Sequence, residues 1–99
     1  MKIEVSHNSL AFRVYQQQVV SEPFSCNYEL NPDFRGELEL AGLRVSGVSE
    51  DGGARIIELP DHLFFLGTGF VPQFTSKEGE PHPLIVAFFR AAMGLGDAI

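Results

Sequence analysis

The sequence is poor in several residue types, and each scarcity narrows what the chain can be. It has no tryptophan and one cysteine, Cys26, among 99 residues. No disulfide bond can therefore form within the chain, and a reducing, cytoplasmic compartment is expected. The longest apolar stretch near the C-terminus, residues 84–89, is far shorter than the roughly 20 residues needed to span a bilayer. Glu4 interrupts the N-terminal segment where a signal peptide needs a continuous apolar run.

Basic side chains are also scarce. Seven Lys and Arg stand against thirteen Asp and Glu, which gives a formal net charge of −6. Nucleic-acid binding is driven by Lys and Arg that displace counterions from phosphates, and anionic membrane surfaces attract the same side chains. We therefore expect no nucleic-acid or membrane partner, and we interpret the acidity as an aid to solubility.

The material for a core is nevertheless present, because 44% of the residues are hydrophobic and nine are Phe. The length fits one domain, residues 1–99. Apolar patterning predicts about five or six strands, mostly joined as hairpins, in the segments 2–5, 17–24 with 26–30 (interrupted at Pro23), 43–48, 55–59 and 63–70. The last of these is an unbroken apolar and small-residue run, which predicts a central strand buried on both faces. Residues 9–15 mix apolar and polar side chains and remain ambiguous.

Two helices are predicted by their end signals. Asn31 is a good N-cap, Pro32 suits the first helical position, and Gly42 ends that helix after apolar residues spaced by four and three. Residues 84–93 are apolar at helical spacing and end at glycines. The sequence therefore predicts an α/β domain with a mixed, largely antiparallel sheet of about five or six strands and two helices.

The segment that begins at Arg55 reads R-I-I-E-L-P-D-H-L-F-F-L-G-T-G-F-V-P-Q-F-T-S-K, and His82-Pro83-Leu84 follows before the last helix. It resembles the phrase E-x-P-x-H-P-F-F-x-x-x-Q-F-H-P-E-F-x-S that closes the class I glutamine amidotransferase domain of CTP synthase. Tyr28-Glu29, Asn31-Pro32 and residues 41–47 lie upstream in family-like order. The resemblance covers nearly the whole chain and implies a truncated domain like the C-terminal half of a flavodoxin-like amidotransferase.

The departures from the family pattern concern catalysis. The family's F-H-P-E-F phrase supplies a histidine base and the glutamate that orients it, and here these positions hold Val71 and Gln73. The resemblance places the family's cysteine nucleophile before the segment that matches this chain. Cys26 lacks a glycine elbow, and it falls where the family has an arginine-rich stretch that holds glutamine. The resemblance therefore implies a non-catalytic relative, with Val71 and Gln73 as vestigial triad positions.

Other chemistry-bearing residues give weaker signals. Cys26 has no cation near it in sequence, so a buried, inert thiol is expected. His7, His62 and His82 lie far apart without metal-ligand spacing. Glu78 and Glu80 with His82 could ligate a metal from their loop, but a solvated acidic loop is the preferred interpretation. We expect neither a metal nor another cofactor.

The aromatic surplus suggests what the chain does. A chain this short is not expected to bury all six phenylalanines of its C-terminal half: Phe64, Phe65, Phe70, Phe74, Phe88 and Phe89. Our leading hypothesis is a self-associating module, most simply a homodimer, or a module that binds another protein. One alternative is a subunit of a split glutamine amidotransferase completed by another chain. A second alternative is a small-ligand sensor that uses the vestigial cleft around Gly67, Gly69 and Gln73.

Overall fold

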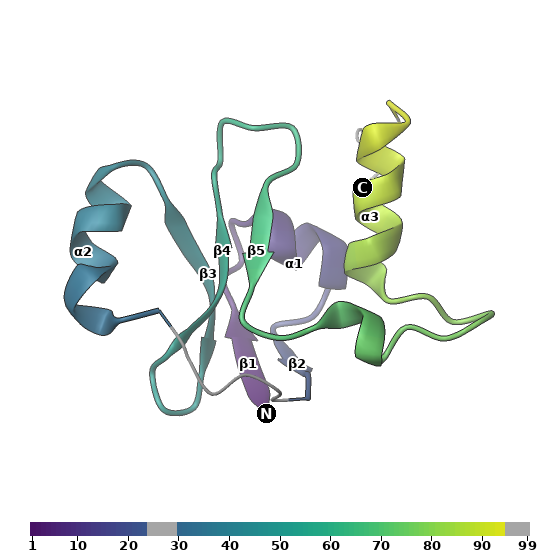
Figure 1. Ribbon diagram of the computed structural model, residues 1–99, viewed down its shortest axis with the longest axis horizontal. Helices are drawn as coiled ribbons and strands as arrows, with labels where there is room; N and C mark the ends of the chain where they lie inside the picture. Colours follow the sequence, from purple (N-terminus) through teal and green to yellow (C-terminus); the bar gives the residue numbers. More distant parts are fainter. Residues whose placement is uncertain (24–29, 95–99) are drawn as a thin grey trace.

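Figure 1 shows the computed structural model, which describes residues 1–23 and 30–94. Within these residues the chain forms a five-stranded antiparallel sheet in the order β2-β1-β3-β4-β5, together with α-helices and one short 3-10 helix. The α/β class and the largely antiparallel sheet are as predicted. The elements are β1 (Lys2–Val5), α1 (Leu10–Tyr15), β2 (Val19–Ser21), α2 (Pro32–Leu40), β3 (Arg44–Ser49), β4 (Ala54–Glu58), β5 (Leu66–Thr68), η1 (Pro72–Phe74) and α3 (Pro83–Ala92).

The alternating patterns identified the inner strands correctly. In β1, Ile3 and Val5 point into the core, while Lys2 and Glu4 are exposed. β3 and β4 pair as a hairpin, as predicted for the segments 43–48 and 55–59, and the register shifts on both sides of Gly47. A side chain at Gly47 would place its Cβ 2.7 Å from side-chain atoms of the buried Ile56. Glycine at this position therefore allows the two strands to approach closely.

The ambiguous segment 9–15 contains a helix, so three α-helices are present in the described residues rather than two. Ser9 is its N-cap, and its hydroxyl accepts a hydrogen bond from the Phe12 amide at 3.1 Å. The buried carboxylate of Glu58 accepts further bonds from the amides of Leu10 (2.9 Å) and Ala11 (3.3 Å). A six-residue helix is marginal by itself. Its stability comes from a tertiary contact that local sequence patterns do not reveal.

The prediction of a central strand over residues 63–70 is wrong. Only Leu66–Thr68 form a strand, and β5 lies at the sheet edge, paired with β4. Leu63 is 70% exposed, because the chain first makes a loop that the Leu59 amide closes on the Phe65 carbonyl at 3.3 Å. The apolar run forms an edge strand and part of the adjacent surface. Composition alone does not distinguish such a segment from a buried central strand. Of the segment predicted over 17–24, the described part, residues 17–23, forms a strand at Val19–Ser21, and most of 26–30 lies outside the described residues.

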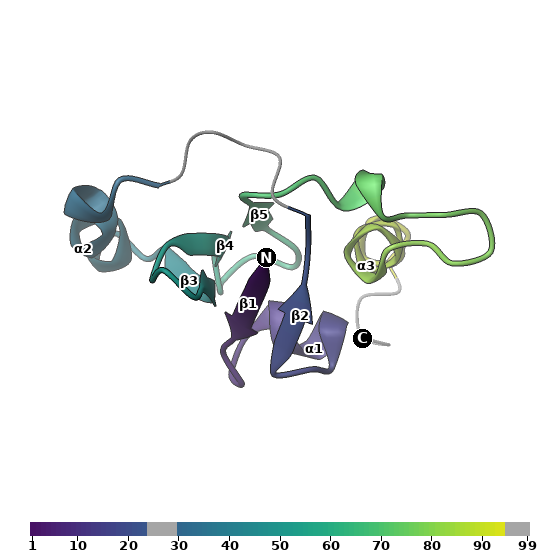
Figure 2. The same ribbon diagram turned by 90° about the horizontal axis from the view of Figure 1, so that it is seen from below.

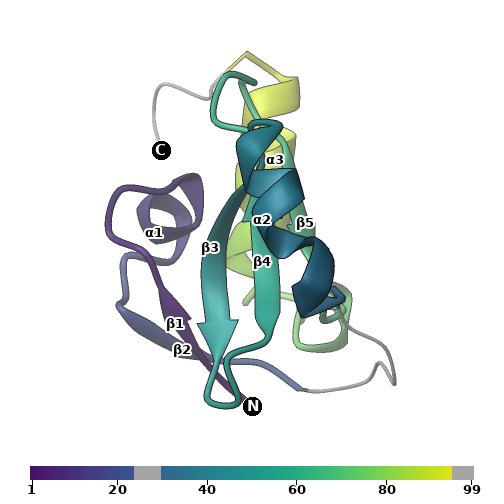
Figure 3. The ribbon, with the colours of Figure 1, turned by 90° about the vertical axis from the view of Figure 1, so that its left-hand side faces the viewer.

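The helices flank the sheet at different places (Figures 1 to 3). α2 and α3 lie at opposite ends of the long axis, and α1 lies between the sheet and α3. α2 begins at its predicted Asn31 cap but buries no residue, and Leu40 is 91% exposed. The core is formed by β1, β2, β4, α1, α3 and the turn after β5, with Ile3, Val5, Ala11, Val20, Ile56, Phe70 and Leu84. Among the described residues, no helix has the length and apolar character needed to cross a membrane.

Candidate functional site

The vestigial triad positions lie at η1, directly after β5 (Figure 1). Val71 is partly buried and caps η1 with its main chain, since its carbonyl accepts from the Phe74 amide at 3.0 Å. Gln73 is exposed. Neither side chain can exchange a proton near neutral pH, so this turn offers neither a base nor a charged group to orient one. Cys26 lies outside the described residues.

The two glycines of the proposed vestigial cleft pack against their own sheet. A Cβ at Gly67 would lie 3.0 Å from the Ile57 side chain across the β4–β5 pair. The Gly69 amide donates to the Arg55 carbonyl at 2.7 Å. Gly67 thus allows close contact with β4, whereas a Cβ at Gly69 would lie at an ordinary contact distance of 3.6 Å from Arg55. Ligand binding at Gly67, Gly69 and Gln73 stays a prediction.

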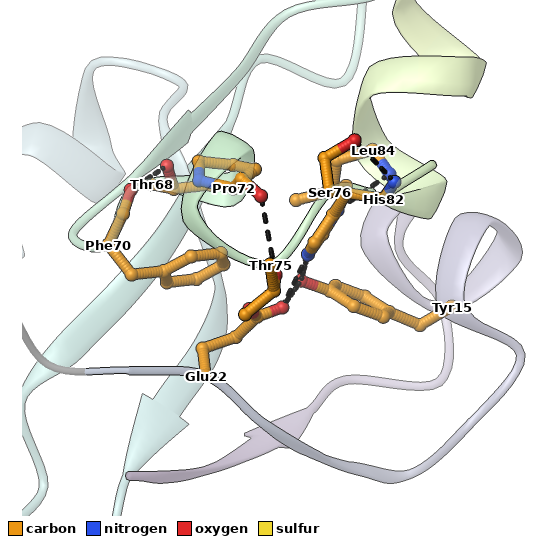
Figure 4. A network of polar contacts seen from close by, with 9 residues as sticks. All are labelled: Tyr15, Glu22, Thr68, Phe70, Pro72, Thr75, Ser76, His82 and Leu84. Atoms are coloured by element: carbon orange, nitrogen blue, oxygen red, sulfur yellow. Dashed lines mark hydrogen bonds and ion pairs between the residues drawn. The ribbon is translucent and has the colours of Figure 1, made fainter. Parts of the chain in front are cut away.

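A buried polar network lies beside this turn, at the start of α3 (Figure 4). Nε2 of His82 lies 2.6 Å from Oε2 of Glu22, and the Tyr15 hydroxyl donates to the same oxygen at 2.7 Å. Glu22 is 4% exposed and His82 is 5% exposed. Burial, then the hydrogen bond and the negative charge of Glu22, raise the pKa of Tyr15 far above its ordinary value of 10.0. The network joins the end of α1, the residue after β2 and the start of α3.

His82 has a defined role in this network. Its Nδ1 accepts a hydrogen bond from the Leu84 amide at 3.1 Å, which caps α3. The proton of the neutral ring is therefore assigned to Nε2, where it points at the Glu22 carboxylate. The His82 amide donates in turn to the Ser76 hydroxyl at 3.1 Å. With both ring nitrogens engaged and the ring buried, His82 is a structural residue.

Sequence spacing missed this network, because Tyr15, Glu22 and His82 are 7 to 67 residues apart. A glutamate next to the apolar strand β2 is the one local hint that a buried charge needs a partner. Glu78 and Glu80 are exposed, while His82 turns away toward Glu22. In residues 1–23 and 30–94, no group of three or more His, Cys, Asp or Glu side chains is placed to hold a metal ion.

The structure brings together two histidines that the sequence keeps apart. His7 and His62 line the same hollow of about 390 Å³, together with Arg13, Arg44 and Glu58. His7 stacks on Phe12 with 4.7 Å between ring centroids. The lining residues come from α1 and the loop before it, the start of β3, and the end of β4 with the loop after it, and none belongs to η1. Sequence analysis had no signal for it, because its walls come from three separate loops and strands.

A second, apolar hollow of about 350 Å³ lies between β5 and α3. We name it the α3–β5 groove, and its lining residues are Phe64, Leu66, Thr68, Pro72, Leu84, Ile85, Phe88 and Phe89. Phe88 is 50% exposed and Phe89 is 61% exposed. Of the six phenylalanines in the surplus, Phe70 is 3% exposed, whereas four are exposed. The prediction that this chain does not bury them all is confirmed.

Comparisons with known proteins agree with the resemblance read from the sequence. No family model matches the chain. It is 43% identical over 95 residues to the CTP synthase of Methanopyrus kandleri, which covers 95% of this chain and 18% of that protein. The CTP synthase of Flavobacterium johnsoniae is 40% identical over 93 residues, or 93% of this chain and 17% of its own length.

A solved structure, the glutaminase domain of Trypanosoma brucei CTPS with bound acivicin, matches with a TM-score of 0.87 at 28% identity. The match covers 94% of this chain and 38% of that one. The chain therefore spans less than a fifth of the two curated relatives above and over a third of the solved domain.

Proposed function

We propose that this chain, a homologue of part of the glutaminase domain of CTP synthase, is a non-catalytic module that binds a protein surface through the α3–β5 groove. In a solution of the pure chain, the apolar surface available to cover that groove belongs to a second copy. The proposal therefore includes a homodimer. The single observation that carries it is the exposure of Phe88 and Phe89 beside an apolar hollow.

Loss of catalysis is supported by the two residues at η1. The resemblance assigns the base to the position of Val71 and the orienting carboxylate to that of Gln73, and neither residue can perform that role. Loss of one triad member typically lowers turnover on the order of 10⁴- to 10⁶-fold. His82 offers no replacement, since it is buried against Glu22 and caps α3.

The groove supports association because its aromatic rings already form one surface. The rings of Phe64 and Phe88 meet edge to face at 5.9 Å, and those of Phe88 and Phe89 at 5.8 Å. Full burial of a Phe side chain contributes roughly 1.5–3 kcal/mol, so the exposed half of each ring would add about 1 kcal/mol on contact. In a two-fold symmetric dimer each contribution is made twice.

Sedimentation velocity at micromolar concentration tests the proposal. We expect the unmodified chain to be a dimer and Phe88→Ser with Phe89→Ser to shift it toward monomer. The double variant removes about 4 kcal/mol from a symmetric interface, roughly a 700-fold increase in dissociation constant. Leu40→Ser is the matched control, because Leu40 is a 91% exposed apolar residue on the distant α2. A compact monomer for the unmodified chain would refute self-association, and equal dissociation in the control would refute the groove.

A second candidate follows from the 38% coverage of the solved glutaminase domain. The chain could complete a split amidotransferase, with another polypeptide supplying the remaining part of the domain over the same groove. Val71 and Gln73 weigh against it, because the base should reside in this chain. Co-expression with such a polypeptide separates the two: a heterodimer with glutaminase activity would favour the split enzyme, and an inactive homodimer would favour the module.

A further inference from the structure

A basic hollow lies away from both the groove and the vestigial triad positions. It is formed by the loop before α1, the start of β3 and the loop after β4, and we define it by His7, Arg13, Arg44 and His62. Its volume is about 390 Å³. Two of the chain's seven Lys and Arg side chains line it, although the chain as a whole carries a net charge of −6.

Arg44 is held in place with donors to spare. Its Nη1 donates to the Asn8 carbonyl at 2.7 Å, which fixes the guanidinium against the loop before α1. The side chain nevertheless stays 45% exposed. A guanidinium carries five N–H donors in a rigid plane, so most remain for a ligand that accepts several hydrogen bonds.

The one acidic residue of the hollow is already compensated. Glu58 is 2% exposed, and its carboxylate accepts from the amides of Leu10 and Ala11 at 2.9 and 3.3 Å. Nη1 of Arg44 lies 4.0 Å from the same carboxylate. The carboxylate of Glu58 therefore stabilises the start of α1 and faces Arg44, while Arg13 is a second, exposed cation that lines the hollow.

We infer that this basic hollow binds a small molecule that carries a phosphate group. A phosphate dianion accepts hydrogen bonds on three oxygens, which matches two guanidinium groups flanked by two imidazoles. The net negative charge of the chain disfavours anions elsewhere on its surface, so an anion that binds must do so locally. This inference is independent of the proposed association, because the hollow and the groove share no lining residue.

Titration of the ¹⁵N-labelled chain with inorganic phosphate tests it, with sodium chloride at matched ionic strength as the reference. Glycerol 2-phosphate is the arm for an organic phosphate, and acetate is the arm for a carboxylate. We expect saturable shifts of the amide signals of residues 7–10, Leu59, Asp61 and His62 with both phosphates, and at least tenfold weaker binding of acetate. Shifts that do not saturate, or acetate binding as tight as phosphate binding, would overturn the inference.

Substitutions locate the site. Arg44→Gln and Arg13→Gln should each weaken phosphate binding about tenfold. Arg13→Gln keeps the test valid if Arg44→Gln disturbs the loop that Arg44 holds. Arg35→Gln is the matched control, because Arg35 lies on α2, is paired with Glu39 at 2.8 Å and does not line the hollow. Unchanged affinity in Arg13→Gln, or an equal loss in Arg35→Gln, would refute the assignment.

Discussion

Replacing His82 with alanine removes three interactions at once, and we expect it to lower the free energy of unfolding by about 3–5 kcal/mol. Loss of the N-cap of α3 costs about 1 kcal/mol. Glu22 would remain buried with Tyr15 as its partner, and a missing hydrogen bond to a buried charged group costs about 1.5–3 kcal/mol. The space left by the ring adds about 1 kcal/mol. A domain of this size has a total stability of roughly 5–15 kcal/mol, so the loss is a large fraction of it.

His82→Asn separates the two polar interactions. Its side-chain oxygen can accept from the Leu84 amide as the imidazole does, but its short side chain does not reach Glu22. We therefore expect His82→Asn to recover about 1 kcal/mol relative to His82→Ala. Glu22→Gln, which keeps the volume but removes the buried charge, should be less destabilising than His82→Ala.

Urea unfolding followed by far-UV circular dichroism measures these differences. The protomer concentration must be the same for all variants, since association stabilises the folded state. A loss below about 1 kcal/mol for His82→Ala would refute the view that Glu22 depends on His82. Equal stability of His82→Ala and His82→Asn would refute the role of Nδ1 as the helix cap.

Three further predictions use the same unfolding assay or a simple activity assay. The pKa of Tyr15 is raised in the folded state, so its stabilising effect is complete below pH 10 and is lost as the unfolded state ionises above it. Above pH 10 the unmodified chain should lose up to about 1.4 kcal/mol per pH unit more than Tyr15→Phe, and parallel curves would contradict this. Gly47→Ala should cost about 1–3 kcal/mol because its Cβ meets the buried side chain opposite on β4, whereas Gly36→Ala, with open space around it, should stabilise α2 by about 0.5–1 kcal/mol. Val71→His with Gln73→Glu should release no ammonia from glutamine, since the 99-residue chain has no cysteine on a glycine elbow; measurable release would show that the nucleophile has been misplaced.

Patterns of adjacent residues correctly predicted the strands, turns and helix ends whose structure is determined within a short segment. The alternation in β1, the glycine turn between β3 and β4, and the Asn31 cap of α2 are each written in a few adjacent residues. α1 was not predicted, because its amides are satisfied by Glu58, 47 to 48 residues away. The position of β5 was also missed, because an apolar run looks the same whether it borders a groove or lies within a sheet.

The candidate site residues also separate into those that the sequence predicted and those that it did not. Val71 and Gln73 were found because a family phrase can be matched position by position. The sequence did not predict the network of Tyr15, Glu22 and His82, because contacts between separate elements leave no periodic pattern in the sequence. The basic hollow was missed for the same reason: His7 and His62 line one hollow because β1 and β4 run in the same direction on either side of β3, so the loops after them leave the sheet at the same end.

The exposed position of α2 has a consequence for local unfolding. No residue of the helix is buried, so we expect α2 to open at a lower free energy than the sheet. Its amide hydrogens should exchange with solvent through local fraying, whereas those of β1, β3 and β4 should exchange through unfolding of the whole domain. We therefore expect substitutions in residues 32–40, or a tag inserted there, to be tolerated more readily than the same changes at a strand.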